Sequence, residues 1–179
     1  MTKRLLLLFG TLALAVLTLQ AQSMASKRLS PPAKATANID DLQIDIEYSQ
    51  PGVKGRTIWG VLVPYGKVWR TGANEATTFT VNNDVLIEGR PLPAGRYALF
   101  SVPGKEKWTI IFNKEADQWG AYNYSKEADV LRVEVPNLDT EFTERMTFNI
   151  ETQDDNSSSV FLKWGDRAFF FVIKAAGQP

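Results

Sequence analysis

The chain has 179 residues, and its 20 lysines and arginines balance its 20 aspartates and glutamates, so the formal net charge at pH 7 is zero. It contains neither histidine nor cysteine. This excludes a Ser-His-Asp triad, a cysteine nucleophile, a histidine-ligated zinc or iron site and haem ligation by those residues. Any catalysis would have to use carboxylates, Lys, Tyr, Ser, Thr or a metal held by oxygen ligands.

The first residues have the pattern of a secretory signal peptide. Lys3 and Arg4 give a positively charged start, residues 5–19 form an apolar run, and small residues follow at 21–25. A membrane anchor is the alternative, but the run is shorter than the roughly 20 apolar residues of a spanning helix. No cysteine follows it, so a lipoprotein anchor is excluded. We expect residues 1–25 to be cleaved and the protein to be exported, to the periplasm or as a secreted protein.

Loss of Lys3 and Arg4 would leave 18 basic and 20 acidic residues, a net charge of −2. Nucleic acids and anionic membranes select basic surfaces, so we expect neither as a partner. We also expect no membrane span after cleavage. The remaining 154 residues are a single-domain length and can bury a core without disulfides.

Residues 26–36 are polar, contain a Pro-Pro pair and are interpreted as an extended linker. The chain then follows a β pattern, with apolar and polar residues alternating at 42–48 and a tight turn at Pro103-Gly104. The expected strands are 42–48, 77–81, 85–87, 96–102, 108–113, 130–135, 145–152, 158–164 and 167–174.

Four details of this β pattern can be tested. We expect residues 82–84 to form a turn after which 85–87 returns as the next strand, and Gly165-Asp166 to join two strands of a meander. Residues 168–173 are apolar almost throughout, as in a central strand buried on both faces. One helical turn is expected at 114–118. Together the pattern predicts an all-β, single-domain antiparallel β-sandwich (jelly-roll-like) over residues 37–176, with a closed barrel as the alternative and a long ordered loop at 51–76.

That loop, extended to residue 78, reads PGVKGRTIWGVLVPYGKVWRTGANEATT. It resembles a phosphate-binding loop, but five rather than four residues separate Gly60 from Gly66, and Val68 stands where a Ser or Thr belongs. No helix is expected after it to hold a phosphate at its N-terminus. Nucleotide binding is therefore not predicted.

The loop instead concentrates aromatic and polar side chains, a combination suited to binding polar ligands. Flat rings stack on the apolar faces of sugars, while arginine, asparagine and glutamate contact hydroxyls or carboxylates. A second loop at 113–123 adds two aromatic residues that could line the same cleft. The candidate ligand-binding residues are Arg56, Trp59, Tyr65, Lys67, Trp69, Arg70, Asn74, Glu75, Trp119 and Tyr122.

A structural interpretation of the same loop stays open. The loop would then cover an open end of the sandwich, with Trp59 and Trp69 in the core and Arg70 paired with Glu75. A third hypothesis is a hydrolase, in which Glu75 acts together with Asp117 or Glu115. Residues 154–156 carry oxygen ligands but lack the spacing of a calcium loop, so a solvated turn is expected there.

Long stretches of the chain are similar to a known bacterial family. The stretch from Pro51 to Thr78, LPAGRYALFSVPGKEKWTIIFNK, QWGAYNY and DVLRVEV resemble the family catalogued as domain of unknown function 2911, over roughly residues 30–175. The resemblance implies an exported, β-rich bacterial domain of the cell envelope or the medium, but no activity.

From the residues we favour a non-catalytic module that binds a glycan or another small polar ligand. A structural or partner-binding domain and a carboxylate hydrolase are the alternatives. We predict no catalytic residue, no metal and no cofactor.

Overall fold

The computed structural model describes residues 28–153 and 157–177. These residues form ten strands and one 3-10 turn. The elements in chain order are β1 (Pro32–Ile39), β2 (Leu42–Ser49), β3 (Thr78–Val81), β4 (Val85–Ile87), β5 (Arg90–Leu92), β6 (Gly95–Val102), β7 (Lys107–Asn113), η1 (Lys126–Ala128), β8 (Asp129–Pro136), β9 (Leu138–Thr152) and β10 (Ser157–Ala175).

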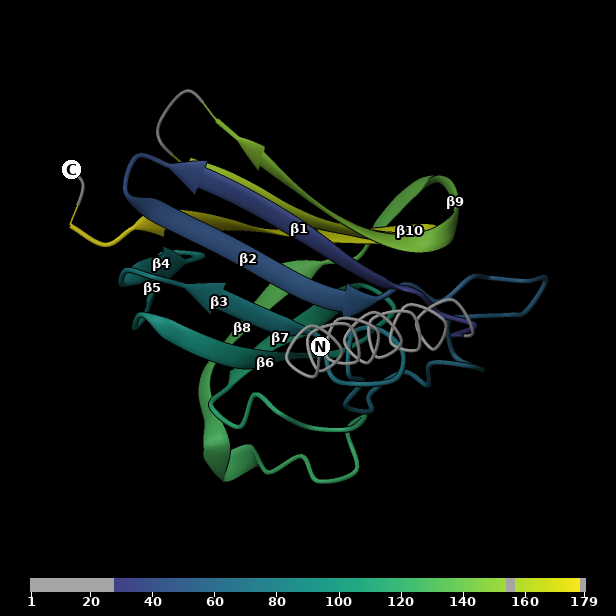
Figure 1. Ribbon diagram of the computed structural model, residues 1–179. Helices are drawn as coiled ribbons and strands as arrows, with labels where there is room; N and C mark the ends of the chain where they lie inside the picture. The colour runs from purple at the N-terminus through teal and green to yellow at the C-terminus, as the bar shows by residue number, and fades with distance from the viewer. Residues whose placement is uncertain (1–27, 154–156, 178–179) are drawn as a thin grey trace, which may run out of the picture.

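The strands form two antiparallel sheets that face each other (Figure 1). The larger sheet has six strands in the order β1-β2-β3-β6-β7-β8, and the smaller has four in the order β5-β4-β10-β9. At the two sides of the molecule β1 lies beside β9, and β5 lies beside β8. The predicted antiparallel β-sandwich is therefore confirmed. Among the described residues no helix is long and apolar enough to cross a membrane.

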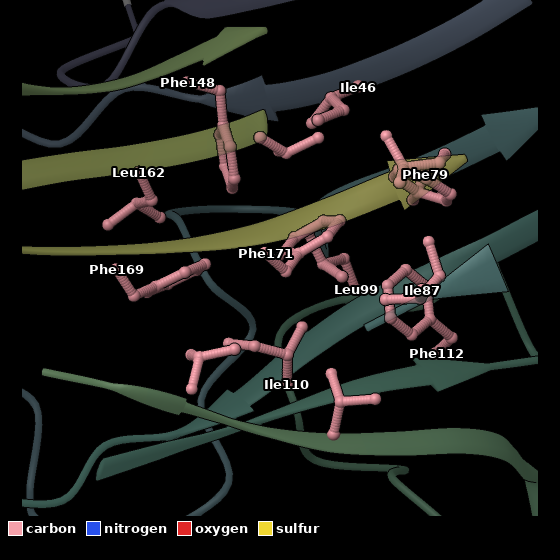
Figure 2. Packing of buried hydrophobic residues seen from close by; sticks show 14 of the residues in the cluster. Ile46, Phe79, Ile87, Leu99, Ile110, Phe112, Phe148, Leu162, Phe169 and Phe171 are labelled. Atoms are coloured by element: carbon pink, nitrogen blue, oxygen red, sulfur yellow. The ribbon is translucent and has the colours of Figure 1, made fainter. Parts of the chain in front are cut away.

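The inner faces of the sheets follow from strict alternation along the strands. In β2, residues 42, 44, 46 and 48 point inward, and the polar residues between them point outward. Figure 2 shows the resulting core, in which side chains of β9 and β10 pack against those of the larger sheet. Phe148, Leu162, Phe169 and Phe171 face Ile46, Phe79, Leu99, Ile110 and Phe112.

Two expected turns are corrected. Residues 82–84 do not reverse the chain into a hairpin, because β3 belongs to the larger sheet and β4 to the smaller one. Asn82 accepts a hydrogen bond from the Gln43 backbone and donates one to the Asp41 carbonyl, which directs this segment across to the other sheet. Gly165-Asp166 is not a turn either, since β10 continues through it with register shifts on both sides of Gly165.

Three further predictions differ from the structure. The predicted linker at 26–36 already contains the start of β1, whose small inward alanines give a weak strand signal. The helical turn expected at 114–118 is absent, and the short helix lies instead at 126–128. Residues 168–173 lie in a central strand, but Phe170 and Val172 remain partly exposed on the outer face.

The short edge strand β5 was not predicted. Residues 1–27, with the predicted signal peptide, and 154–156 lie outside the described residues.

A cluster of four tryptophans closes one end of the sandwich. Trp108 comes from β7, Trp164 from β10, and Trp59 and Trp69 from the long crossover between β2 and β3. Trp69 stacks on Trp164 with ring centroids 5.8 Å apart, and the Trp59 ring meets the other three edge to face. Such ring pairs contribute about 0.5–1.5 kcal/mol beyond the burial of their area. The cluster therefore ties the crossover to both sheets.

Replacing Phe171 with alanine is expected to lower the free energy of unfolding by about 3–5 kcal/mol, because this ring is fully buried against Phe79 and Phe112. Phe142→Ala is the matched control. Phe142 is 65% exposed, so its removal should change the free energy by less than about 0.5 kcal/mol. Urea denaturation followed by tryptophan fluorescence measures both. Equal losses in the two variants would contradict this assignment of the core.

Candidate functional site

Hydrogen bonds hold the middle of the crossover, residues 69–77, in place, and we refer to this segment as the structural clasp. Trp69 and Ser101 exchange two backbone hydrogen bonds of 2.8 and 2.9 Å, and the Trp69 indole donates to the Gly72 carbonyl. The buried Thr71 hydroxyl lies 2.9 Å from the Ser101 hydroxyl, and the Thr77 hydroxyl donates to the Thr71 carbonyl. This arrangement holds Thr71 at a φ of 53°, which is uncommon for a β-branched residue. Residues 69–77 thus have one fixed shape.

The clasp places the two aromatic loops side by side. The Ala76 backbone donates to the Gln118 carbonyl at 2.9 Å, and the Gly120 backbone donates to the Asn74 carbonyl at 3.1 Å. These bonds pair Glu75 with Trp119 in a short antiparallel bridge. The Trp119 side chain is left 59% exposed. Tryptophan is enriched at interfaces, because its ring offers an apolar surface and its N–H a hydrogen-bond donor.

The segment that carries Trp119 packs on the outside of the larger sheet. Strands β6 and β7 have apolar residues on both faces, and the outward Phe100 and Ile111 need a cover. Ala121 and Tyr124 pack against this second, smaller cluster. Figure 1 shows the segment 114–128 as the green loop below β6, outside the sandwich. The apolar outer face of β6 and β7 is therefore the reason that this loop folds back.

Hydrogen bonds from β7 and β8 fix the same segment. The fully buried Asn113 amide donates to the Ser125 carbonyl and to the Asp129 carboxylate, each at 2.9 Å. The Tyr124 hydroxyl donates to the other oxygen of that carboxylate at 2.6 Å. Arg132 donates to it as well, at 2.7 Å. Trp119 thus sits on a loop that is anchored at both ends.

A groove runs across the outer face of β1, β2, β3 and β6. Strand register places Lys34, Glu47, Thr78 and Ala98 in one outward row across these four strands. The small side chains of Ala76 and Thr78 lie among the longer side chains that line the hollow. The groove has a volume of about 580 Å³, and a depression of about 220 Å³ adjoins it beneath Trp119. Glu75, Ala76, Thr78 and Arg96 line both.

Charged side chains of both signs line this groove. Arg28 pairs with Glu75 at 2.9 Å and Arg96 with Asp117 at 2.7 Å. Lys34 pairs with Asp45 at 3.0 Å and with Glu47 at 3.8 Å. Apart from Asp45, which is 18% exposed, every partner is at least 42% exposed. Exposed ion pairs of this kind contribute only about 0–1 kcal/mol each, so a polar ligand could replace them at little cost.

The structure separates the predicted site residues. Glu75 and Trp119 line the groove and its adjoining depression. Arg56, Trp59 and Tyr65 line a different pocket, at the end of the sandwich. Lys67 is exposed and lines neither of them.

The remaining predicted residues have other surroundings. Trp69 is buried in the tryptophan cluster, as the structural interpretation expected, and offers no surface to a ligand here. The Asn74 amide donates to the Ser30 carbonyl and the Ser49 hydroxyl, which holds the start of β1 against the crossover. The Tyr122 ring is 83% exposed and lies over Gly120, outside the groove.

Arg70 differs from the expected pairing with Glu75, because Glu75 pairs with Arg28. The Arg70 Nε atom is buried without a hydrogen-bond partner, and within the described residues no carboxylate lies in ion-pair distance of the guanidinium. Burial lowers the pKa of Arg70 from its ordinary value. The side chain therefore contributes a partly desolvated and uncompensated positive charge.

Sequence reasoning missed most of the groove. Arg28, Lys34, Glu47, Thr78 and Arg96 line it, and none of them was singled out. The outward positions of β2 were readable from the alternation at 42–48. Which outward residues of other strands lie beside them depends on strand order, which the alternation does not give.

Glu75 and Asp117 both line the depression, but each is in an ion pair with an arginine. Within residues 28–153 and 157–177, no group of three or more acidic side chains is arranged to hold a metal.

The fold and the groove define a two-sheet β-sandwich with a polar, aromatic-edged hollow on the outer face of its larger sheet. The chain belongs to the family described as protein of unknown function (DUF2911), which matches residues 30–173 and confirms the resemblance noted from the sequence. Among curated proteins and among solved structures, nothing matches the chain.

Thr71→Val is expected to lower the free energy of unfolding by about 1–3 kcal/mol, because it leaves the buried Ser101 hydroxyl without its partner. Arg70→Met should lose less than about 0.5 kcal/mol, or gain stability, since burial disfavours an unpaired charge. Urea denaturation of the two variants tests the pair. A larger loss from Arg70→Met than from Thr71→Val would show that Arg70, too, is part of the clasp.

Burial, together with the hydrogen bond to Asp129, raises the pKa of Tyr124 to about 12 from its ordinary 10.0. The folded protein therefore favours the neutral phenol, and this contribution to stability is present below about pH 10 and lost as pH rises through about 12. The free energy of unfolding, measured by urea denaturation over this window, should fall more steeply in the wild type than in Tyr124→Phe. Equal slopes would contradict a raised pKa for Tyr124.

Proposed function

We propose that this protein is an exported, non-catalytic binding module that holds a glycan in the groove beside Trp119. The observation that carries the proposal is the exposed Trp119 ring at the edge of a hollow lined by hydrogen-bonding side chains. Sugars combine apolar ring faces with many hydroxyls, and a site that recognises them needs both kinds of surface. The groove supplies both.

The polar side chains of the groove suit hydroxyl groups better than a strongly charged ligand. Three cations and three carboxylates, Arg28, Lys34, Arg96, Glu47, Glu75 and Asp117, line the groove and the depression, so their charges balance. Guanidinium groups donate and carboxylates accept, and a sugar hydroxyl can do both. A balanced set of donors and acceptors therefore matches a neutral polyhydroxylated chain.

The combined volume of the groove and the depression also favours an extended ligand. The groove of about 580 Å³ and the depression of about 220 Å³ adjoin along the outer sheet face. Each lies near or within the range of roughly 300–1,000 Å³ that small-ligand sites occupy. A ligand that filled both would be larger than one sugar ring, which points to an oligosaccharide or the exposed part of a polysaccharide.

The structural clasp is compatible with this proposal. The bonds around Trp69 and Thr71 fix residues 69–77, and the bridge from Glu75 to Trp119 fixes the backbone that carries the stacking ring. A site whose backbone is already ordered loses less conformational entropy when a ligand binds. The clasp thus prepares the site, whereas the structural interpretation alone leaves the exposed Trp119 unexplained.

Affinity electrophoresis in gels containing a neutral β-glucan, a neutral α-glucan, a xylan or a polyuronate tests the proposal. At least one neutral polysaccharide should retard the protein, and Trp119→Ala should weaken that retardation by about tenfold or more. Phe142→Ala removes an aromatic residue of similar exposure from a different pocket and should leave retardation unchanged. No retardation in any gel, or equal loss in both variants, would contradict glycan binding in the groove.

The same samples separate binding from hydrolysis. A binding module leaves each polysaccharide intact after long incubation. Release of reducing ends that Glu75→Gln abolishes, with an unchanged free energy of unfolding, would instead support the carboxylate hydrolase.

A further inference from the structure

A second pocket, of about 380 Å³, lies where the crossover meets the corner formed by β9 and β10. We refer to it as the end pocket; its walls include Arg56, Trp59, Tyr65, Phe142, Gly165 and Arg167. It shares no lining residue with the groove. In Figure 1 the crossover and the bend of β9 lie together at the end of the sandwich away from β4 and β5.

The aromatic part of the end pocket is held firmly. Trp59 forms part of the wall, and its ring is fixed by edge-to-face contacts with three buried tryptophans. Tyr65 packs against Gly60, where a Cβ atom would lie 2.9 Å from the Tyr65 ring and where φ is 83°. The 65% exposed Phe142 ring adds an apolar side to the opening. These rings form a surface for a flat apolar group.

The bulge in β10 leaves the wall of the end pocket without a side chain beside the Trp59 indole. Gly165 has a φ of 61° and register shifts on both sides, so the strand bends there without a side chain. A Cβ atom on Gly165 would lie 3.7 Å from Trp59 Nε1. That indole N–H is buried and has no acceptor within the described residues. The atom is shielded from solvent, as are the unpaired N–H groups of Trp108 and Trp164 in the same cluster.

Arg56 is a cation of the end pocket that has no carboxylate partner among the described residues. Arg56 donates from Nε to the Val53 carbonyl at 3.1 Å and from one terminal nitrogen to the Gly52 carbonyl at 2.6 Å. These two bonds orient the guanidinium and leave its other terminal nitrogen unused. In the part of the chain that the structure describes, no carboxylate lies within ion-pair distance of Arg56.

The other charged groups around the end pocket are paired with one another, and their charges sum to −1. Arg167 forms ion pairs with Asp139 and Asp166. With Arg56 the sum is zero, and within the described residues the donor that remains open to a ligand is the Arg56 guanidinium. A ligand that completes this site must supply acceptors for Arg56, and a carboxylate supplies two.

We propose that the end pocket binds a small monocarboxylate that carries a flat apolar body, such as a single aromatic ring. The carboxylate is held by Arg56 above Gly165, and the apolar body lies against Trp59, Tyr65 and Phe142. A pocket of about 380 Å³ is at the small end of the range of roughly 300–1,000 Å³ for ligand sites, which fits one ring plus a carboxylate. This proposal is independent of glycan binding in the groove.

Titration with benzoate, followed by two-dimensional NMR of the indole N–H signals, tests it. Each of the five tryptophans gives its own signal, and Trp59→Phe and Trp119→Phe assign the two that matter. Ionic strength is held constant with chloride. Benzoate should shift the Trp59 signal in a saturable way and leave that of Trp119 in place. Benzamide, which keeps the shape and loses the charge, should bind at least about tenfold more weakly.

Variants locate the carboxylate. Arg56→Gln should weaken benzoate binding at least about tenfold, while Arg96→Gln, in the groove, should not change it. Arg56→Lys keeps the charge and is a second variant if Arg56→Gln fails to fold; it should bind benzoate more tightly than benzamide. No saturable shift at Trp59, equal binding of benzamide, or undiminished binding by folded Arg56→Gln would each overturn the proposal.

Discussion

The packing of four indoles at one end of the sandwich is the constraint on which both candidate sites depend. Trp108 and Trp164 come from opposite sheets, and Trp59 and Trp69 bring the crossover against them. The chain has no disulfide with which to fix a long crossover, so ring packing must do so. Edge-to-face contacts have a narrow range of geometries, and they therefore fix orientation as well as position.

The tryptophan cluster holds two parts of the protein surface in place. Through the backbone bonds of Trp69 with Ser101 and the bridge from Glu75 to Trp119, it positions the backbone of Trp119 at the edge of the groove. Through Trp59, it forms a fixed wall of the end pocket. The crossover, which is rich in aromatic, charged and glycine residues, therefore contributes to both the groove and the end pocket. The side chains of its central part lie in the core and line neither site.

The sequence predicted elements better than the relations between them. Alternation at 42–48 and the Pro103-Gly104 turn led correctly to β2 and to the β6–β7 hairpin. The same local signals failed at 82–84 and at Gly165. A polar turn has the same sequence pattern whether it reverses a strand or crosses to another sheet. A glycine likewise gives the same local signal in a turn and in a bulge.

The composition and order of residues by themselves determined the all-β class, the family and the classes of chemistry that the chain cannot perform, because these depend on residue types and on local periodicity. Only the tertiary structure decided which candidate residues act together. It placed Trp69 in the core, Trp119 beside Glu75, and Arg56 with Trp59 and Tyr65 in a separate pocket. The physical reason is that strand order and the packing of the crossover bring residues together across long sequence separations, and no local pattern encodes those contacts.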